Sequence, residues 1–210
     1  MSKDLTLYGT HTSGPVYKVA LALSLLGKDY AFRYVDFDTK AHKSPDYLAV
    51  NRYGQVPALK LADGRVLVQS AAILEYLADG AGKLGGADAA ERALVREWLY
   101  WDADKLSPGI YRSRAIARGK LVADPAVAAF FRAAGEDGHA VLEAQLARGK
   151  RLVGAGPTIA DIAIYGVVVF APQGGFDLGR WPAVKAFISR VEALAGWKPQ
   201  SELAPAHDRE

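Results

Sequence analysis

A glycine-rich segment divides the chain into two parts with different hydrophobic patterns. The segment, "DGAGKLGGAD", spans Asp79 to Asp88. Before it, runs with a period near two alternate with runs of helical period; after it, the pattern is helical, rich in alanine and nearly free of strand signals. Such a break is typical of an interdomain linker. We therefore predict a first domain over residues 1–79, a linker over residues 80–88 and a second domain over residues 89–210.

The first part predicts the element order β-α-β-α-β-β-α. An Asp-Gly pair between the apolar runs "VPALKL" and "RVLVQ" indicates a hairpin, and Ser70 stands where it can cap the helix "AAILEYLAD". The order is that of a thioredoxin-like domain. The other predicted elements are strands over Leu5–Tyr8 and Ala31–Phe37, a helix through Val16, Val19, Ala20 and Leu23 that ends near Gly27, and a short helical turn in "KSPDYLAVN".

The second part predicts an all-helical domain. Thr158 and Asp161 stand three residues apart before an apolar run, which indicates a capping box with Asp in place of the usual Glu or Gln. The run leaves little polar face, so we expect that helix to be buried. The expected helices cover residues 89–118, 125–148, 159–170 and 182–195.

Composition excludes several kinds of chemistry. The chain has no cysteine, so disulfides and any mechanism that uses a thiol of the protein are ruled out. Its four histidines are far apart and lack cysteine partners, which argues against zinc or another metal site. The 26 basic and 23 acidic residues are mixed along the chain, so we expect no nucleic-acid partner. Without a signal peptide or a transmembrane run, we expect a cytoplasmic protein with no membrane partner.

Two stretches of the first domain suggest a binding site for a peptide-like ligand. In "YGQVPAL", Pro57 enters a strand; it is either an ordinary edge-strand proline or part of a cis Val56–Pro57 bond that turns the Val56 backbone toward a ligand. In "VQSAAILEYL", Gln69 and Ser70 lie where a strand hands over to a helix, so their side chains and the first free N–H groups can receive a carboxylate. The alternative for Ser70 is a simple helix cap.

Taken together, these motifs resemble the glutathione S-transferases. "SGPVYKV", "YGQVPALKL", the Asp-Gly turn, "QSAAILEYL", the linker and "PTIADIAIYG" follow one another in the family's order and spacing along almost the whole chain. The resemblance implies a thioredoxin-like domain that binds glutathione as co-substrate, without a metal. It also implies a helical domain that supplies most of the site for a small hydrophobic electrophile, and a homodimer.

Members of this family hold the glutathione sulfur through one of two hydroxyl positions. Tyr8 stands at the tyrosine-type position, whereas Ser13, followed by Gly14 and Pro15, looks like the serine of the theta and zeta classes. We favour Ser13 because the basic turn of the tyrosine-type classes is absent here. A free thiol with a pKa of about 8.5 is only a few per cent thiolate at neutral pH, and a helix N-terminus plus one donated hydrogen bond would favour the anion. Thr10 or Thr12 could donate instead, and Ser13 could merely cap a helix.

The resemblance implies roles for three more residues of the first domain. His42 matches a histidine that contacts the glycyl carboxylate of glutathione in theta-class members, and Gln55 precedes Val56 where a loop residue commonly assists. Tyr53 stands where some classes insert an aromatic side chain into the partner subunit. The alternatives are an exposed loop histidine and a surface tyrosine. Arg52 replaces a proline that is common there, which predicts a less rigid loop.

The expected activity is conjugation of the glutathione thiolate to an electrophile. Trp101, Lys105 and Tyr111 lie along the first long helix of the second domain and are the candidates for the electrophile site, although an aromatic stripe is more often core. Peroxidase, isomerase or dehalogenase chemistry through bound glutathione is the enzymatic alternative. The remaining alternative is a non-catalytic protein that binds glutathione or another ligand.

Overall fold

The computed structural model describes residues 4–149 and 151–210. Residues 1–3, which the sequence assigns to the first domain, lie outside the described residues. The chain forms two units, one that contains the described residues up to Lys83 together with Leu194–Glu210, and one that contains Leu84–Ala193. Each unit has its own hydrophobic core.

The first unit is built on a mixed sheet of four strands in the order β2-β1-β3-β4. Strand β1 pairs in parallel with β2 and antiparallel with β3, and β3 pairs antiparallel with β4. This confirms the thioredoxin-like βαβαββα order. The elements are β1 (Thr6–Gly9), α1 (Gly14–Leu25), β2 (Ala31–Tyr34), a 3₁₀ turn (Ala41–Lys43), α2 (Pro45–Val50), β3 (Ala58–Lys60), β4 (Val66–Val68) and α3 (Ser70–Ala81).

The predicted hairpin joins β3 to β4 as expected. Gly64 in its turn has a φ of +86°, which glycine adopts at no steric cost. The side chain of Asp63 accepts a hydrogen bond from the N–H of Arg65 at 3.0 Å and closes the turn locally. Contacts within the turn itself therefore bring β4 back alongside β3.

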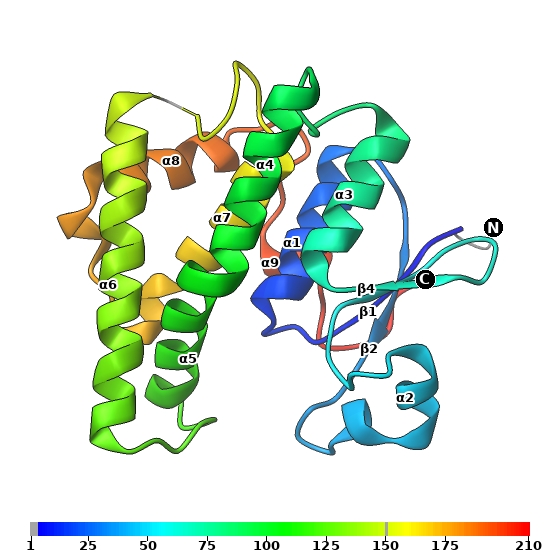
Figure 1. Cartoon of the computed structure of the whole chain (residues 1–210). Helices are drawn as coiled ribbons and strands as arrows, with labels where there is room; N and C mark the ends of the chain where they lie inside the picture. The colour runs from blue at the N-terminus through cyan, green and yellow to red at the C-terminus, as the bar shows by residue number, and fades with distance from the viewer. Residues whose placement is uncertain (1–3, 150) are drawn as a thin grey trace. The chain divides into compact units, whose positions relative to one another are not determined.

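Helices α1 and α3 lie side by side on one side of the sheet, whereas α2 lies apart from them (Figure 1). Both helices turn their apolar faces inward, and the sheet contributes side chains from its two central strands and from β2. Burying these apolar side chains removes them from water, which is the main force that holds the unit together. The fully or nearly fully buried residues include Leu7, Val19, Leu23, Phe32, Leu59, Ile73, Leu74 and Leu77.

The last seventeen residues differ from the domain division expected from the sequence, which places them in the helical domain. Leu194–Glu210, with the short helix α9 (Gln200–Leu203), groups instead with the thioredoxin-like unit. Arg209 forms an antiparallel bridge with Phe32 on the outer edge of β2. Backbone pairing of one residue leaves no periodic pattern, so the sequence carries no signal for this return.

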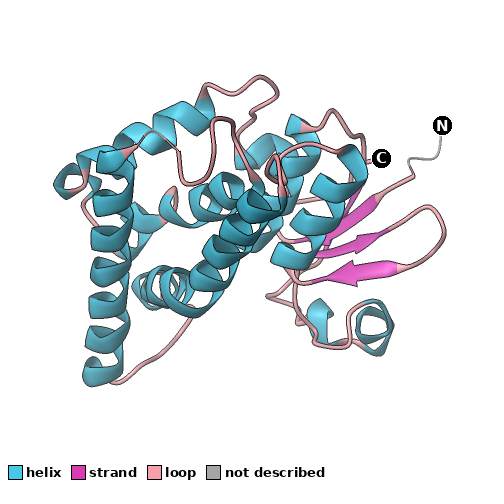
Figure 2. Cartoon of the chain, turned by 45° about the horizontal axis from the view of Figure 1, so that its top comes forward, coloured by secondary structure: helices cyan, strands magenta, loops and turns pink. Residues whose placement is uncertain are grey.

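The second unit is all helical, as predicted (Figure 2). Its helices are α4 (Ala89–Trp101), α5 (Ser107–Ala117), α6 (Pro125–Arg148), α7 (Ile159–Val168) and α8 (Pro182–Glu192), with 3₁₀ turns at Ala171–Gly174 and Leu178–Arg180. The expected helix over residues 89–118 is interrupted by a π-helical turn, Asp102–Leu106. An added Cβ at Gly109 would lie 2.5 Å from the backbone N of Gly135, so the close approach of α5 and α6 requires glycine there.

Helix α7 is buried along its whole length, as its apolar sequence predicts. The capping box at its start is present: the N–H of Thr158 donates to Asp161 Oδ2 at 2.8 Å. None of the helices in the described parts of the chain is long and apolar enough to cross a membrane.

Candidate active site

The turn between β1 and α1 places Ser13 at the N-terminal cap of α1. The N–H of Ser13 donates to the carbonyl oxygen of Thr10 at 3.1 Å, and its Oγ accepts a hydrogen bond from the N–H of Val16 at 3.3 Å. Pro15 lies in the first turn, where its missing N–H costs nothing. Ser13 therefore caps the helix, which is the alternative role that the sequence offers for it.

The capping role leaves the hydroxyl proton of Ser13 available. Among the described residues, Ser13 Oγ accepts from Val16 and donates to no group, and the N–H of Gly14 likewise has no acceptor. Both donors lie at the positive end of α1, where an anion is favoured. The first turn of α1 can thus receive an anionic atom from a hydroxyl and a backbone N–H.

Tyr8, the other candidate, lies half-buried in the middle of β1. Its ring makes an edge contact with Tyr47, with 6.3 Å between the ring centroids. Burial first, and then the neighbouring Tyr8, raise the pKa of Tyr47 far above its usual value, so Tyr47 stays protonated. The Tyr47 hydroxyl donates to the carbonyl oxygen of Gln55 at 2.8 Å. Tyr8 therefore packs against a residue that supports the loop before β3.

That loop is held by Asn51, which the sequence analysis missed. Asn51 is only 1% exposed; its Nδ2 donates to the carbonyl oxygen of Gln55 at 2.7 Å, and its Oδ1 accepts from the N–H of Tyr53 at 3.1 Å. Lys43 Nζ adds a bond to the carbonyl oxygen of Gly54 at 3.2 Å. The amide side chain fixes the loop locally even though Arg52 stands where proline is common.

The loop leads into a peptide bond between Val56 and Pro57 that is cis, which is one part of the sharper sequence interpretation. That the Val56 backbone faces a ligand stays a prediction. Pro57 is buried and Val56 is half-buried immediately before β3. Gln55 is exposed on the same loop, and its Oε1 accepts from Gln69 Nε2 at 3.3 Å. The fold thus brings the residues before β3 together with those at the start of α3.

Helix α3 begins differently from the prediction. Ser70 is the first helical residue, and Gln69 occupies the cap position with a φ of +71° and no side-chain cap. Strand β4 ends at Val68, so one residue must make the whole turn from strand to helix. Among the described residues, the first N–H groups of α3, those of Ser70, Ala71 and Ala72, have no acceptor. They form a second position where a carboxylate could bind.

His42 lies in the 3₁₀ turn before α2, with its ring stacked on Phe37 at 4.0 Å between centroids. Its Nδ1 is shielded from solvent and has no hydrogen-bond partner in the described chain. Burial, and then the charges of Lys43 and Lys40, lower the pKa of His42. It therefore offers a hydrogen bond, more than a positive charge, to a ligand.

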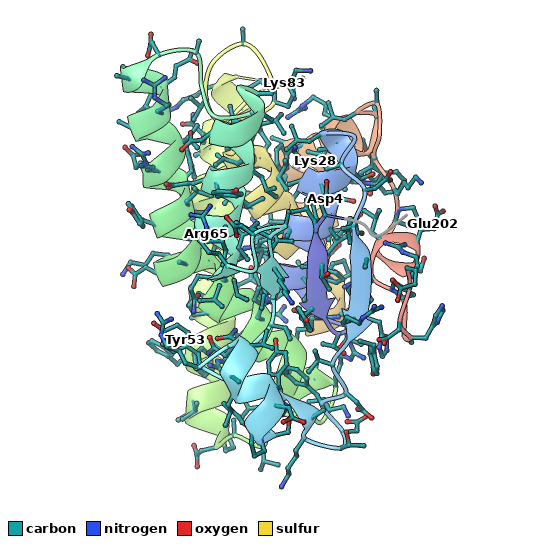
Figure 3. All side chains as sticks on the ribbon, turned by 90° about the vertical axis from the view of Figure 1, so that its right-hand side faces the viewer. Asp4, Lys28, Tyr53, Arg65, Lys83 and Glu202 are labelled. Carbon is teal, nitrogen blue, oxygen red and sulfur yellow. The ribbon has the colours of Figure 1, made fainter. Side chains whose placement is uncertain are left out.

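Tyr53 is 48% exposed on the same loop (Figure 3). The guanidinium carbon of Arg52 lies 4.5 Å from the centre of its ring, and Arg52 Nη2 donates to the Tyr53 hydroxyl at 2.8 Å. An exposed aromatic side chain held by a cation can contact a partner, but it is equally a surface tyrosine.

The three candidates in the second unit have different surroundings. Trp101 ends α4 and makes an edge contact with Trp98 at 5.2 Å between ring centroids. Lys105 is exposed in the π-helical turn and pairs with Asp104 at 2.9 Å. The Tyr111 hydroxyl donates to the carbonyl oxygen of Gly166 at 2.7 Å, so its polar end joins α5 to α7. Within the described residues, no three His, Asp or Glu side chains group as they would around a metal ion.

Comparison with known proteins adds independent information. The model of the glutathione S-transferase N-terminal domain matches residues 3–79, and that of the C-terminal domain matches residues 139–195. Maleylacetoacetate isomerase from Rhizobium meliloti (strain 1021) is 35% identical over 92% of this chain and 94% of its own length. Glutathione S-transferase 3 from Zea mays is 35% identical over 96% and 95%, respectively. The crystal structure of a glutathione S-transferase from Pseudomonas fluorescens superposes with a TM-score of 0.88 at 33% identity, over 94% of this chain and 98% of that one.

Proposed function

Because this chain belongs to the glutathione S-transferase family, we propose that it conjugates the thiolate of glutathione to a small hydrophobic electrophile. The observation that carries the proposal is the position of Ser13. Its hydroxyl caps α1 by accepting a hydrogen bond and, among the described residues, donates its own proton to no group. A donor at the positive end of a helix is what a thiolate needs.

The chemistry asked of the protein is activation and positioning. A free thiol has a pKa of about 8.5, and each unit by which the site lowers it corresponds to about 1.4 kcal/mol of preference for the anion. The Ser13 hydroxyl and the Gly14 N–H would donate to the sulfur. The thiolate lone pair then forms the carbon–sulfur bond while a leaving group departs, or while the neighbouring carbon of an activated double bond takes a proton from water.

The remaining site residues would hold the tripeptide. The open start of α3, with Gln69 and Ser70, would receive one carboxylate, and the Val56 backbone beside Pro57 would pair with the peptide. His42 would hydrogen-bond the other carboxylate, with Gln55 assisting. Trp101, Lys105 and Tyr111 are the proposed electrophile-site residues.

The test is an ultraviolet titration of the thiolate band of bound glutathione in the wild type, Ser13→Ala and Tyr8→Phe proteins. We expect the wild type to lower the thiol pKa and Ser13→Ala to abolish most of that shift. A loss in Tyr8→Phe instead would move the role to Tyr8 and leave the transferase activity in place. No thiolate band at saturating glutathione would contradict the enzymatic function and leave a ligand-binding protein.

A second candidate is a glutathione-dependent isomerase, which the similarity to maleylacetoacetate isomerase favours. The same thiolate would add to a double bond, allow rotation about the resulting single bond and then leave again. The two activities differ in the fate of glutathione, because a transferase consumes it and an isomerase regenerates it. Following free thiol during turnover of a maleyl compound separates them.

The proposal includes a homodimer with Tyr53 in its interface. Tyr53 is exposed and its hydroxyl accepts a hydrogen bond from Arg52, so its ring is available on the surface for a partner. Sedimentation of the wild type and Tyr53→Ala proteins tests this. A wild-type monomer at micromolar concentration, or a dimer that Tyr53→Ala leaves unchanged, would contradict it.

A further inference from the structure

The C-terminal segment runs along α1 toward the candidate sulfur site. Ser24 Oγ, near the end of α1, donates to the carbonyl oxygen of Gly196 at 2.6 Å. Nearer the N-terminal end of the same helix, the Tyr17 hydroxyl donates to the carbonyl oxygen of Lys198 at 2.9 Å. The segment thus advances from residue 196 to residue 198 while the helix positions it contacts move back toward the N-terminus.

The next contact in this series reaches Ser13 itself. Gln200 Nε2 donates to the backbone carbonyl oxygen of Ser13 at 3.1 Å. The same oxygen accepts the first intrahelical bond, from the N–H of Tyr17 at 3.0 Å. Among the described residues, Gln200 is the only one whose side chain donates to the Ser13 carbonyl oxygen.

This bond acts on a peptide group that faces the candidate site. The carbonyl of Ser13 and the N–H of Gly14 belong to one planar peptide unit and point in opposite directions. Two donors on the carbonyl oxygen therefore fix the direction of the Gly14 N–H. They also polarise it into a better donor, since hydrogen bonds in a chain strengthen one another.

The segment beyond Gln200 is anchored independently of Ser13. Leu203 and Ala204 are buried, and the Tyr30 hydroxyl donates to the carbonyl oxygen of Leu203 at 2.6 Å. Further on, the N–H of Arg209 donates to the carbonyl oxygen of Phe32 at 2.9 Å. Figure 3 shows this segment, with Glu202 labelled, beyond the β2 side of the sheet, away from Arg65 in the hairpin. The segment that carries Gln200 is therefore held in place by contacts of its own.

We propose that Gln200 is a positioning residue for thiolate formation. It acts through the Ser13–Gly14 peptide group. A side chain of the short helix α9 thereby influences how strongly the first turn of α1 stabilises the glutathione sulfur. The inference rests on the proposed function, because it concerns the same anion position.

The test measures the thiol pKa of bound glutathione in Gln200→Ala and Gln200→Met, the second of which keeps the length of the side chain without a donor. We expect both to raise the pKa by about 0.5 unit, which is about a threefold loss of thiolate at pH values well below that pKa and a smaller loss near it. kcat should fall in proportion to the thiolate lost at each pH, and the difference from the wild type should vanish at alkaline pH, where the thiol is ionised in any case.

Two control variants separate this role from simple anchoring of the segment. Ser201→Ala alters the exposed neighbour on the same short helix, and Tyr30→Phe removes an anchor of the segment that does not touch Ser13. Neither should move the thiol pKa, even if Tyr30→Phe lowers the melting temperature.

The outcomes are distinct from those that test the proposed function. A wild-type protein that lowers the thiol pKa, with both Gln200 variants matching it, would overturn the role of Gln200 and leave Ser13 in place. An equal rise in Tyr30→Phe would show that docking of the segment, not the amide, matters, and would also overturn it. A wild type without a thiolate band would remove the proposed function itself.

Discussion

The sequence predicts a side-chain cap for both α3 and α7, at Ser70 and Thr158, yet the two helices begin in different ways. At α7 the prediction is correct: the capping box of Thr158 and Asp161 is present within a fully buried start, and the N–H of Ile159 donates to the carbonyl oxygen of Leu84 at 2.8 Å. At α3 Ser70 has already entered the helix, and the cap position belongs to Gln69, whose side chain caps nothing.

The difference follows from where the two helix starts lie. Inside a core, an unpaired N–H group costs about as much as a lost hydrogen bond, so the chain must supply an acceptor itself. At α3 the first N–H groups lack acceptors among the described residues, and Gln69 is exposed. A helix start whose N–H groups have no acceptor suits a carboxylate, and functional sites are where local rules are expected to fail.

We call the start of α7 the closed start, because N–H groups there are paired within the fold, and the start of α3 the open start. The largest expected effect comes from breaking the closed start. Asp161→Ala removes the acceptor of the buried Thr158 N–H and should lower the free energy of unfolding by about 3 kcal/mol. Three of the four tryptophans, Trp98, Trp101 and Trp181, lie in the second unit and the fourth, Trp197, in the first, so urea unfolding followed by tryptophan fluorescence reports mainly on the second unit. Asp161→Asn keeps an acceptor and should lose clearly less. Equal losses in the two variants would mean that the cap is not what the carboxylate contributes.

The next largest effect is on ligand binding at the open start, where stability should hardly change. Ser70→Ala should weaken glutathione binding about tenfold, since a hydroxyl beside the carboxylate position is lost, and should leave the unfolding free energy within about 0.5 kcal/mol of the wild type. Thr158→Ala is the matched variant in the closed start; it should cost about 1 kcal/mol of stability and leave binding unchanged. Calorimetric titration with glutathione and urea unfolding decide the matter. A stability loss in Ser70→Ala would make it a structural cap after all.

The contrast also shows which features a sequence can predict. The strand and helix order, the Asp63–Gly64 hairpin, the bounds of α6 and the capping box at Thr158 all follow from patterns within a few residues. The one-residue turn at Gln69 does not, because it depends on where β4 stops pairing with β3.

Contacts that leave no periodic signal in the sequence account for the other differences. Asn51 supports the loop before Pro57 through bonds that leave no periodic signal, and the π-helical turn after Trp101 interrupts an otherwise regular helical pattern. Gln200 reaches Ser13 across 187 positions of sequence. A motif predicted Ser13 as a site residue, but no motif could indicate which distant side chain holds its peptide group.

A smaller effect sharpens the comparison at Gln69. Its φ of +71° is a conformation that a side chain disfavours and glycine does not. Gln69→Gly should therefore raise the unfolding free energy of the first unit by about 1 kcal/mol, after the greater freedom of glycine in the unfolded chain is allowed for. It should at the same time weaken glutathione binding. Gln69→Ala should lose the binding without the gain in stability, and a Gly variant no more stable than the Ala variant would contradict the strain.

The smallest effect is a pH dependence that only the closed start should show. Burial raises the pKa of Asp161, and the hydrogen bonds from Thr158 partly oppose that shift, so a modest upward shift remains. A carboxyl group whose folded pKa lies above its unfolded value holds more protons in the folded state. Its contribution to stability is therefore greatest at acid pH and decreases as the pH rises above about 4 toward the folded pKa.

Asp161→Asn isolates this contribution, because it keeps an acceptor but cannot titrate. The stability of the wild type relative to Asp161→Asn should fall as the pH rises from about 3.5 to 7, as measured by urea unfolding at each pH. Ser70→Ala, at the open start, should show no such trend against the wild type. A difference between wild type and Asp161→Asn that grows with pH would mean that the hydrogen bonds to the ionised carboxylate outweigh its burial. The N–H groups at the closed start would then be stabilised by the ionised Asp161 carboxylate. Those at the open start would be stabilised in the same way by the carboxylate of the proposed ligand.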